Sequence, residues 1–392
     1  MARRRLGTPN RQVSVCCGRY KDSIAWTHIE PKEPLWLFKP YDADADAVYR
    51  ELWSLRDIFA PMGDPASGIV TTHDDFAISF TPSDARQKIQ TLLATGNEAE
   101  ARQKFRLCSQ DQWDYGRAKE ELPAVDLAAA TREIAYRPFD SRWTIWNRNV
   151  AVHRRERITS HMQEGNIALD VCRVVSREWR HVLAIDLPPD DSLVSNRTKE
   201  RGFVFPIRVG RAENLGSSFR EFADQRYNNH YAPEEIFGYI YAVLHAPTYR
   251  SRYAEFLRID FPRVPFPEAA EPFESLSVLG WALVQAHLLR ELPRRNLATY
   301  HGKGDHSVEA VRYVPADEAI AINETQFFRP VPLDVWSFHI GGYQVLDKYL
   351  KSRKGRVLSL DEINHVGAIT DSLAFTIEQM ARIDEAYRAT FP

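Results

Sequence analysis

The chain has 392 residues, of which 44% are hydrophobic and 27% are charged. This length and composition are those of a folded globular protein with room for two or three compact units. The formal net charge is −2, so the chain as a whole has no basic excess that would indicate nucleic-acid binding. A local basic face can still attract phosphate, because the local field determines that attraction.

The four cysteines, Cys16, Cys17, Cys108 and Cys172, do not have the C-x-x-C spacing of a zinc site. We interpret them as reduced thiols rather than as a disulfide framework. The sequence has no run of 18 apolar residues, and the basic start Met1–Gly7 is not followed by the apolar segment of a signal peptide. We therefore expect a cytoplasmic protein with no membrane partner.

The first 135 residues predict a mixture of strands and helices. Leu35–Phe38 is an apolar run bounded by prolines, which is typical of a short buried strand. Residues 41–60 favour a helix after an Asp-rich start, and Phe76–Phe80 alternates like a strand. Residues 83–133 are helical in composition, with a polar break at Trp113–Gly116.

The character of the sequence changes after Tyr136. Residues 136–210 carry Trp, Val, Ile and Arg in short runs, which predicts strands with long polar connections. Residues 211–230 are polar and contain Gly, Ser and Asn, which predicts a linker. From Pro233 the chain favours helices, since a proline followed by two glutamates suits a first helical turn.

The C-terminal part repeats this helical pattern. Residues 308–328 contain two strand-like pieces, and Ser359 with Glu362 forms the capping-box pattern of a long helix. Together the patterns predict an α+β fold with a mixed domain at 1–135, a β-rich domain at 136–232 and a mainly helical domain at 233–392.

Three strings invite a chemical interpretation. Asp64–Gly68 resembles the start of a glycine-rich methyl-donor loop, but Ile69 and Val70 stand where small residues are needed. Asp186–Asp190 lacks the Asp-Pro-Pro-aromatic order that holds a target adenine, so we predict a proline turn. His301–His306 has two imidazoles between glycines, which favours a polar turn over a metal site. The sequence has no G-x-x-x-x-G-K-[ST] string, so we predict no ATP motor. Because none of the three strings holds up, we also predict no catalytic residue and no metal in this chain.

Basic segments are the better candidates for function. Arginine forks fit both phosphates and guanine edges. The first segment supplies six candidate DNA contacts: Arg142, Arg148, His153, Arg154, Arg155 and Arg157. Trp143 and Trp146 beside them favour a strand anchored in the core. A solvated basic face is the alternative for this segment.

Three further groups of candidates follow. Arg173 and Arg177 flank an apolar pair at the ends of strands or loops. The polar loop after the proline turn supplies side-chain types that reach bases and phosphates: Asn196, Arg197, Lys199 and Arg201. A cationic run at a helix end supplies Lys351, Arg353, Lys354 and Arg356. The alternative for this run is ordinary complementation of a helix C-terminus, with Gly355 as its cap.

A succession of motifs resembles the C-terminal region of the type ISP restriction–modification enzymes. The most distinctive stretches are Phe237–Pro267 and Val335–Arg356. The other matching segments, in order, are Gly68–Thr71, Asp74–Phe76, Tyr136–Trp143, His161–Met162, Trp179–Val182, Ser195–Asn196, Phe205–Pro206 and Val311–Tyr313.

This resemblance implies a DNA target recognition domain from Tyr136 to about Pro206, braced by a helical C-terminal domain. The expected function is sequence-specific recognition of double-stranded DNA without a cofactor of its own. The family's S-adenosylmethionine, ATP and Mg²⁺ belong to methyltransferase, helicase and nuclease segments. We find no such segment in this sequence, so we expect a fragment of a split gene, a subunit that works beside a separate catalytic chain, or a remnant. Two alternatives stay open: a part of an adenine-N6 methyltransferase and restriction enzyme, and a scaffold that has lost DNA binding.

Overall fold

The computed structural model divides into two compact units, Met1–Leu52 and Trp53–Pro392. The structure describes residues 2–5, 26–29, 42–109, 111–162, 165–197, 199–293 and 295–392. The predicted strand at Leu35–Phe38 and two of the cysteines, Cys16 and Cys17, lie outside the described residues.

The first unit contains a strand pair and a helix. Strand β1 (Ala2–Arg5) pairs antiparallel with β2 (Trp26–Ile29). Helix α1 (Ala43–Arg50) begins at Asp42, whose carboxylate accepts a hydrogen bond from the Ala45 amide at 3.0 Å. This N-cap satisfies one of the free amides at the helix start.

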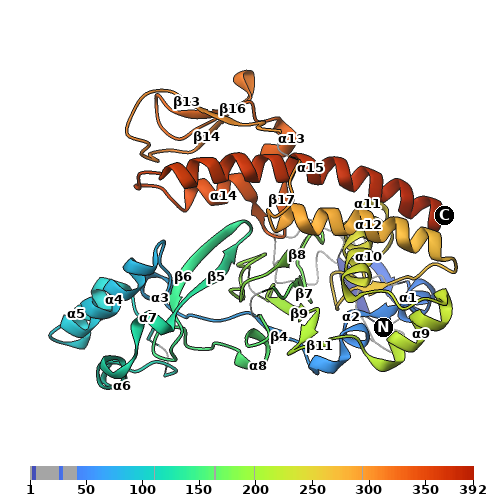
Figure 1. Ribbon diagram of the computed structural model, residues 1–392, viewed down its shortest axis with the longest axis horizontal. Coiled ribbons are helices and arrows are strands. Elements are labelled where there is room, and N and C mark those ends of the chain that lie inside the picture. The colour runs from blue at the N-terminus through green and yellow to red at the C-terminus, as the bar shows by residue number, and fades with distance from the viewer. Residues whose placement is uncertain are drawn as a thin grey trace, which may run out of the picture. The chain divides into compact units, whose positions relative to one another are not determined.

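A four-stranded antiparallel sheet, in the order β4-β9-β7-β8, lies at the centre of the second unit (Figure 1). Its strands are β4 (Ala66–Ser67), β9 (Gly202–Pro206), β7 (Ala168–Cys172) and β8 (Val182–Ile185). Every residue of β7 and β8 is buried, which explains why their sequences are apolar without alternation apart from Asp170. Because β4 precedes Tyr136, the sheet combines two of the three predicted domains, whose boundaries stay predictions.

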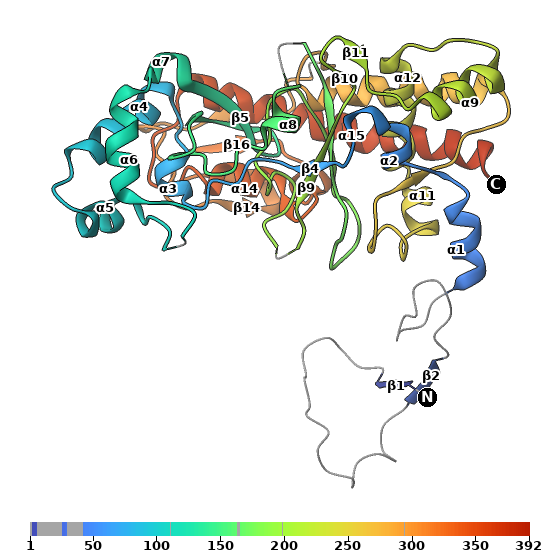
Figure 2. The same ribbon diagram turned by 90° about the horizontal axis from the view of Figure 1, so that it is seen from below.

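Helices α3 to α7 gather around the β5–β6 hairpin, as Figure 1 and Figure 2 both show. Their bounds are α3 (Asp74–Ala77), α4 (Pro82–Ala94), α5 (Glu98–Phe105), α6 (Tyr115–Glu121), α7 (Leu127–Ala130), β5 (Thr131–Arg137) and β6 (Asp140–Ile145). The helices predicted at residues 83–133 are confirmed as far as Ala130, but Thr131 begins strand β5. The predicted strand at Phe76–Phe80 is wrong at its start, where Phe76 belongs to α3, although Ser79 forms an isolated bridge with Trp143. Phe76 and Ala77 are both 1% exposed, so consecutive side chains enter one core and the segment turns as a helix.

The predicted linker at residues 211–230 is also wrong. It contains helix α9 (Ser217–Tyr227), which buries Phe219, Ala223 and Tyr227 at helical spacing. Phe219 packs edge-on against Trp53 with ring centroids 5.2 Å apart. The residues that suggested a linker lie mainly at the ends of this helix, such as Gly216 at its N-cap and Asn228 at its C-cap.

Helices dominate from Pro233 onward, as predicted. Their bounds are α10 (Pro233–His245), α11 (Pro247–Arg252), α12 (Ala270–His287), α13 (Leu333–Trp336), α14 (Val345–Lys351) and α15 (Leu360–Thr390). Ser359 and Glu362 form the predicted capping box of α15. Helices α10 and α12 cross at Gly238 and Gly280, where a Cβ on Gly280 would lie 1.9 Å from the Gly238 carbonyl oxygen.

A second antiparallel sheet, in the order β13-β16-β15-β14, adjoins α13 and α15. Its strands are β13 (Thr299–His301), β14 (Arg312–Val314), β15 (Ala319–Ala321) and β16 (Phe327–Arg329). The two predicted strand-like pieces therefore supply β14, β15 and the start of β16. The fold class is α+β, as predicted.

Short elements complete the described chain: β3 (Trp53–Ser54), β12 (Arg263–Val264), α2 (Leu55–Ile58), α8 (Glu156–Thr159), β10 (Arg208–Val209), β11 (Ala212–Glu213), β17 (His339–Ile340), β18 (Tyr343–Gln344) and the 3-10 turns Ala60–Met62, Leu122–Ala124 and Pro315–Asp317. Across the described ranges, none of the helices is both long and apolar enough to span a membrane.

Candidate nucleic-acid interface

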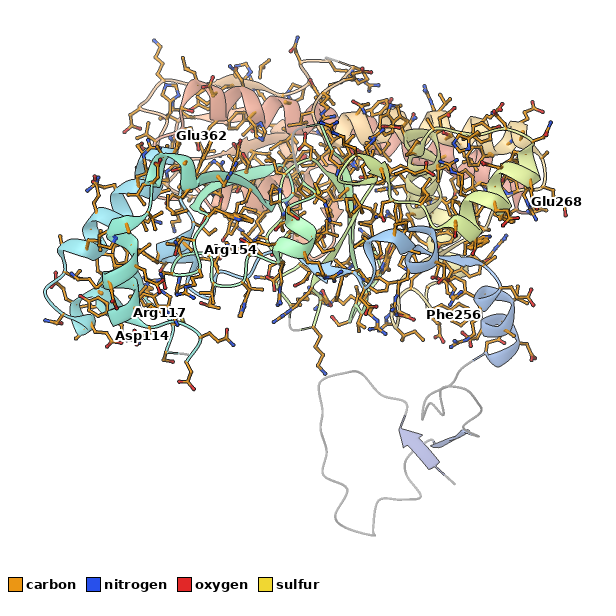
Figure 3. All side chains as sticks on the ribbon, turned by 60° about the horizontal axis from the view of Figure 1, so that its bottom comes forward. Asp114, Arg117, Arg154, Phe256, Glu268 and Glu362 are labelled. Carbon is orange, nitrogen blue, oxygen red and sulfur yellow. The ribbon has the colours of Figure 1, made fainter. Side chains whose placement is uncertain are left out.

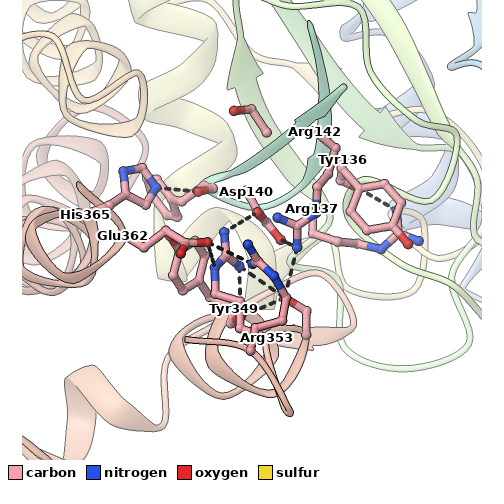
Figure 4. Close-up of polar contacts among 12 residues, drawn as sticks. Tyr136, Arg137, Asp140, Arg142, Tyr349, Arg353, Glu362 and His365 are labelled. Atoms are coloured by element: carbon pink, nitrogen blue, oxygen red, sulfur yellow. Dashed lines mark hydrogen bonds and ion pairs between the residues drawn. The ribbon is translucent and has the colours of Figure 1, made fainter. Parts of the chain in front are cut away.

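Two of the predicted DNA contacts, Arg142 and Arg353, lie inside the protein on either side of Asp140 (Figure 4). Asp140 accepts hydrogen bonds from Arg142 at 2.7 Å and from Arg353 at 3.0 Å, and all three side chains are at most 4% exposed. Burial lowers the pKa of Arg142 to about 10, although Asp140 raises it. These arginines join β6 to the segment after α14, so we assign them a structural role and leave them out of the proposed DNA surface.

The remaining cations of the run after α14 differ in their surroundings. Arg356 contacts Glu362 at 3.0 Å, and Lys351 pairs with Asp347 at 2.9 Å. Lys354 is exposed, and no described residue pairs with it. The run therefore offers Lys354 as its most available cation, while helix-end pairing accounts for Lys351.

Two arginines of the first basic segment are held by carboxylates at the surface. Arg148 forms a bidentate pair with Glu121, in which the Nε–Oε2 distance is 3.1 Å. Arg154, labelled in Figure 3, donates to Glu156 at 2.9 Å. Each pair leaves less positive charge available for a phosphate than an unpaired arginine would.

The other three candidates of this segment have different surroundings. His153 contacts the Gln112 side-chain oxygen at 2.8 Å, and Arg157 donates to the Met62 carbonyl at 2.9 Å. Arg155 is exposed, and no described residue pairs with its side chain. Arg155 is therefore the free arginine of the segment as far as the structure describes it.

The polar loop Ser195–Arg201 is anchored from beneath by Glu200, which is 1% exposed. Glu200 accepts hydrogen bonds from the Ser195 hydroxyl and the Ser176 amide, both at 2.7 Å. Burial opposes its ionisation, but these hydrogen bonds outweigh burial and lower the pKa of Glu200 to about 2. His181 lies 3.3 Å from the same carboxylate. An ionised, buried anchor of this kind fixes the loop that it holds.

This anchoring leaves the predicted base-reading and phosphate-binding side chains at the surface. Asn196 and Lys199 are exposed, and Arg197 is partly exposed with no described side-chain partner. Arg201 is 57% exposed, with its Nε 3.4 Å from Asp191. All four side chains that sequence placed in this loop are therefore accessible to a ligand.

The first basic segment and the polar loop meet in the folded chain. Burial lowers the pKa of His153, and the charges of Arg155 and Arg201 lower it further, so His153 lies within the fields of both arginines and favours its neutral form. The backbone explains this meeting. Val70 exchanges hydrogen bonds with His153, both at 3.0 Å, and the Gly68 amide donates to the Gly202 carbonyl at 3.3 Å. We call His153, Arg155 and Arg201 the basic surface.

Arg173 and Arg177 lie apart from these contacts in the chain between β7 and β8. Arg173 pairs with Asp260 at 2.8 Å, and its guanidinium lies 5.7 Å from the centre of the Phe261 ring. Arg177 is exposed. The structure thus gives Arg173 an internal partner and leaves Arg177 available.

The two strings that resemble methyltransferase motifs pack against each other. The Ile69 amide donates to the Pro189 carbonyl at 2.8 Å, and a Cβ on Gly68 would lie 2.5 Å from that same oxygen. Asp190 is buried and accepts a hydrogen bond from Arg137 at 2.7 Å; burial raises the pKa of Asp190 to about 7, although Arg137 lowers it. Gly68 thus packs closely against backbone, and Asp190 is committed to an ion pair with Arg137.

The histidine-containing turn has local partners as well. His301 contacts the Thr299 hydroxyl at 2.7 Å, and the His306 ring stacks on Tyr300 at 5.3 Å. Within the described parts of the chain, no three His, Cys, Asp or Glu side chains gather as metal ligands.

Three solved structures have a similar fold. The chain resembles the DrdV–DNA complex with a TM-score of 0.70 and 17% identity, over 93% of this chain and 40% of that one. It resembles a nuclease-deletion mutant of the type ISP restriction–modification enzyme LlaGI in complex with a DNA substrate mimic, with a TM-score of 0.66 and 16% identity, over 92% and 30% of the two chains. It also resembles the ATP-dependent type ISP enzyme LlaBIII bound to DNA, with a TM-score of 0.69 and 14% identity, over 92% and 25%.

The family follows from the sequence itself. Residues 61–381 match the model of the type ISP C-terminal specificity domain, and the chain belongs to that family. The resemblance found in the sequence is thereby confirmed. No curated protein matches the chain closely enough to be compared with it. The chain spans less than half the length of each of the three structures that it resembles.

Proposed function

We propose that this chain is a sequence-specific recognition module for double-stranded DNA in a restriction–modification system. The observation that carries the proposal is that Val70 and Gly68 hydrogen-bond to His153 and Gly202, which joins the segments of Arg155 and Arg201 beside a loop that buried Glu200 anchors. Recognition side chains commonly lie on loops that a rigid scaffold positions. Membership of a specificity-domain family and the DNA complexes of the three similar structures support the same conclusion.

The accessible side chains divide into two proposed roles. Exposed cations bind phosphates, because they serve any sequence alike. These cations are Arg155, Lys199, Arg201, Lys354 and Arg177. Asn196 and Arg197 read base edges, because amide and guanidinium groups pair with adenine and guanine in the major groove. Residues 136–232 form the reading domain, and residues 233–392 brace it.

The decisive test compares variants on a selected DNA target. Duplexes that the wild-type chain enriches from a randomised pool define that target, and fluorescence anisotropy then measures affinity at several salt concentrations. The Arg155→Ala/Arg201→Ala variant should bind every sequence more weakly and lower the slope of log affinity against log salt by roughly 2, at about 0.9 per phosphate contact. The Arg197→Ala variant should lose about 1–3 kcal/mol on the target and relax its preference.

A matched control is available in Arg148→Ala. Arg148 and Arg201 are both 57% exposed, but Arg148 is held by Glu121. Binding of the double variant with the affinity and salt slope of Arg148→Ala would contradict the proposed phosphate contacts. Equal losses on all sequences for Arg197→Ala would contradict its base-reading role.

We also propose that S-adenosylmethionine, ATP and Mg²⁺ act on segments outside these 392 residues, whether in the same polypeptide or on a partner chain. The packing of Gly68 against Pro189 supports this for S-adenosylmethionine. Saturable binding of S-adenosylmethionine by the chain, measured by calorimetry, would favour the alternative of a methyltransferase part and refute this assignment.

A further inference from the structure

A cleft of about 650 Å³ lies beside the anchored loop and has no role in the sequence-based interpretation. This volume is in the range of sites that hold small ligands. Its walls come from the segment before β8, from α11 and the residues after it, from the turn before β17 and from α15. The lining residues are Glu178, Trp179, Arg180, Pro247, Arg250, Ser251, Ala254, Arg258, Phe338, His339 and Met380.

Arg250 is the central group of this cleft. Its Nε donates to the Leu244 carbonyl at 2.6 Å, and its guanidinium lies 5.6 Å from the centre of the Trp179 ring. No described carboxylate pairs with it, although a guanidinium carries five N–H donors. Burial lowers the pKa of Arg250 to about 10, and the charge of Arg180 lowers it further. The protein thus holds a half-buried arginine with which no described carboxylate forms an ion pair.

Two more arginines face the same space from exposed positions. Arg180 pairs with Glu178 at 2.7 Å, but their side chains are 41% and 72% exposed, and such pairs contribute little. Arg258 donates to the Ser176 carbonyl at 3.0 Å, which leaves donors for another acceptor. Glu178 is the acidic group among the lining residues that the structure describes, so arginines outnumber acids in the cleft.

Trp179 lines the cleft as well. It is 2% exposed, and its indole N–H has no hydrogen-bond partner among the described residues. That N–H is closed to solvent, so Trp179 offers the cleft its ring beside Arg250 and not a hydrogen bond.

The cleft adjoins the anchored loop. The charges of Arg197 and Arg250 both act on His181, whose pKa burial lowers to about 4. The Gly341 amide donates to the Arg180 carbonyl, and the Gly342 amide donates to the Val194 carbonyl, both at 2.8 Å. Gly341 and Gly342 connect β17 to β18, and β17 contributes His339 to the wall of the cleft. This hairpin therefore packs against the start of the loop as well.

We propose that this cleft binds a phosphate group between Arg180, Arg250 and Arg258. Planar arginine forks match the oxygens of a phosphate in two-point contacts, and its negative charge would offset the excess positive charge of the cleft. Sequence gave no sign of the site, because these arginines come from separate segments and only folding brings them together. The phosphate is either a backbone group of bound DNA, which rests on the proposed function, or part of a free nucleotide or inorganic phosphate.

The test titrates the full chain with inorganic phosphate and with ATP by calorimetry, at constant ionic strength maintained with chloride. The Arg180→Ala/Arg258→Ala variant changes only exposed side chains, so it should fold. We expect saturable binding by the wild type and at least tenfold weaker binding by the variant. Arg173→Ala, which removes an exposed arginine outside the cleft, should bind like the wild type.

A second arm separates the two sources of phosphate. If DNA supplies it, the double variant lowers the salt slope of DNA binding by roughly 1, at about 0.9 for the one phosphate contact that is lost. If a free ligand supplies it, DNA binding is unchanged while phosphate or ATP binding falls. The proposal is refuted if the wild type shows no saturable phosphate binding and the double variant leaves the DNA salt slope unchanged. Failure of the wild type to bind DNA at all, with phosphate binding intact, would instead refute the proposed function.

Discussion

Replacement of Asp140 by asparagine should destabilise the second unit strongly while leaving its shape almost unchanged. Asp140 is the shared partner of Arg142 and Arg353, at 2.7 Å and 3.0 Å, in a region where all three side chains are nearly inaccessible. Asparagine has the same size but no charge. The substitution therefore leaves two buried guanidinium groups without the anion that offsets their desolvation.

The size of the effect follows from the partners that remain. Arg353 keeps Glu362 at 2.9 Å, whereas Arg142 keeps only the Ser352 hydroxyl at 3.1 Å among its hydrogen bonds. Removal of one partner from a buried ion pair costs about 3–5 kcal/mol. Because Glu362 still compensates one of the two arginines, we expect a loss of about 3–4 kcal/mol in the free energy of unfolding.

Urea denaturation of the wild type, Asp140→Asn and Arg148→Ala measures this loss. Arg148→Ala breaks an exposed pair with Glu121 and should cost less than about 1 kcal/mol. If Asp140→Asn were no more destabilising than Arg148→Ala, the charges around Asp140 would be solvated and the structural role assigned to Arg142 and Arg353 would fail.

Two further predictions concern packing and pH. Gly280→Ala places a Cβ 1.9 Å from the Gly238 carbonyl oxygen, so it should force α10 and α12 apart and cost about 1–3 kcal/mol of stability. The control is Gly96→Ala, whose Cβ would have the flexible Glu100 side chain 3.6 Å away. Thermal melts should show the loss for Gly280→Ala and almost none for Gly96→Ala. Burial lowers the pKa of His181 to about 4, so the unfolded state takes up its proton first, and acidification from pH 6.5 to 4 should remove roughly 3 kcal/mol of stability. Urea titrations across that range should show the loss in the wild type and a shallower loss in His181→Asn; equal slopes would contradict this.

Much of the helical fold could be predicted because its signals are local. Pro233 with its glutamates and the Ser359–Glu362 capping box specify helix starts within a few residues. The two wrong predictions, at Phe76–Phe80 and at 211–230, failed for one physical reason. Phe76 is buried beside Phe105 and Phe219 is buried beside Trp53, so each burial depends on a distant segment. The alternation or polarity of a segment's own residues does not indicate such contacts.

The candidate site shows the same limit more sharply. Arg155 and Arg353 are both arginines in basic runs of the sequence, but Arg155 is exposed and Arg353 is buried beside Asp140. The carboxylate that decides the matter is more than two hundred residues away in the chain. Composition could therefore indicate which side chains are able to bind DNA, but only the fold shows which of them already serve an internal partner.

Glu200 connects the two proposals made for this chain. Its buried carboxylate holds Ser195 and Ser176 and adjoins His181, so it fixes the loop on one side and the wall of the arginine cleft on the other. A loop fixed before binding loses less conformational entropy when a ligand arrives, and its side chains meet that ligand in a defined arrangement. Glu200→Gln should therefore weaken both DNA binding and phosphate binding although Glu200 itself contacts neither ligand. Loss of one without the other would show that the loop and the cleft are held independently.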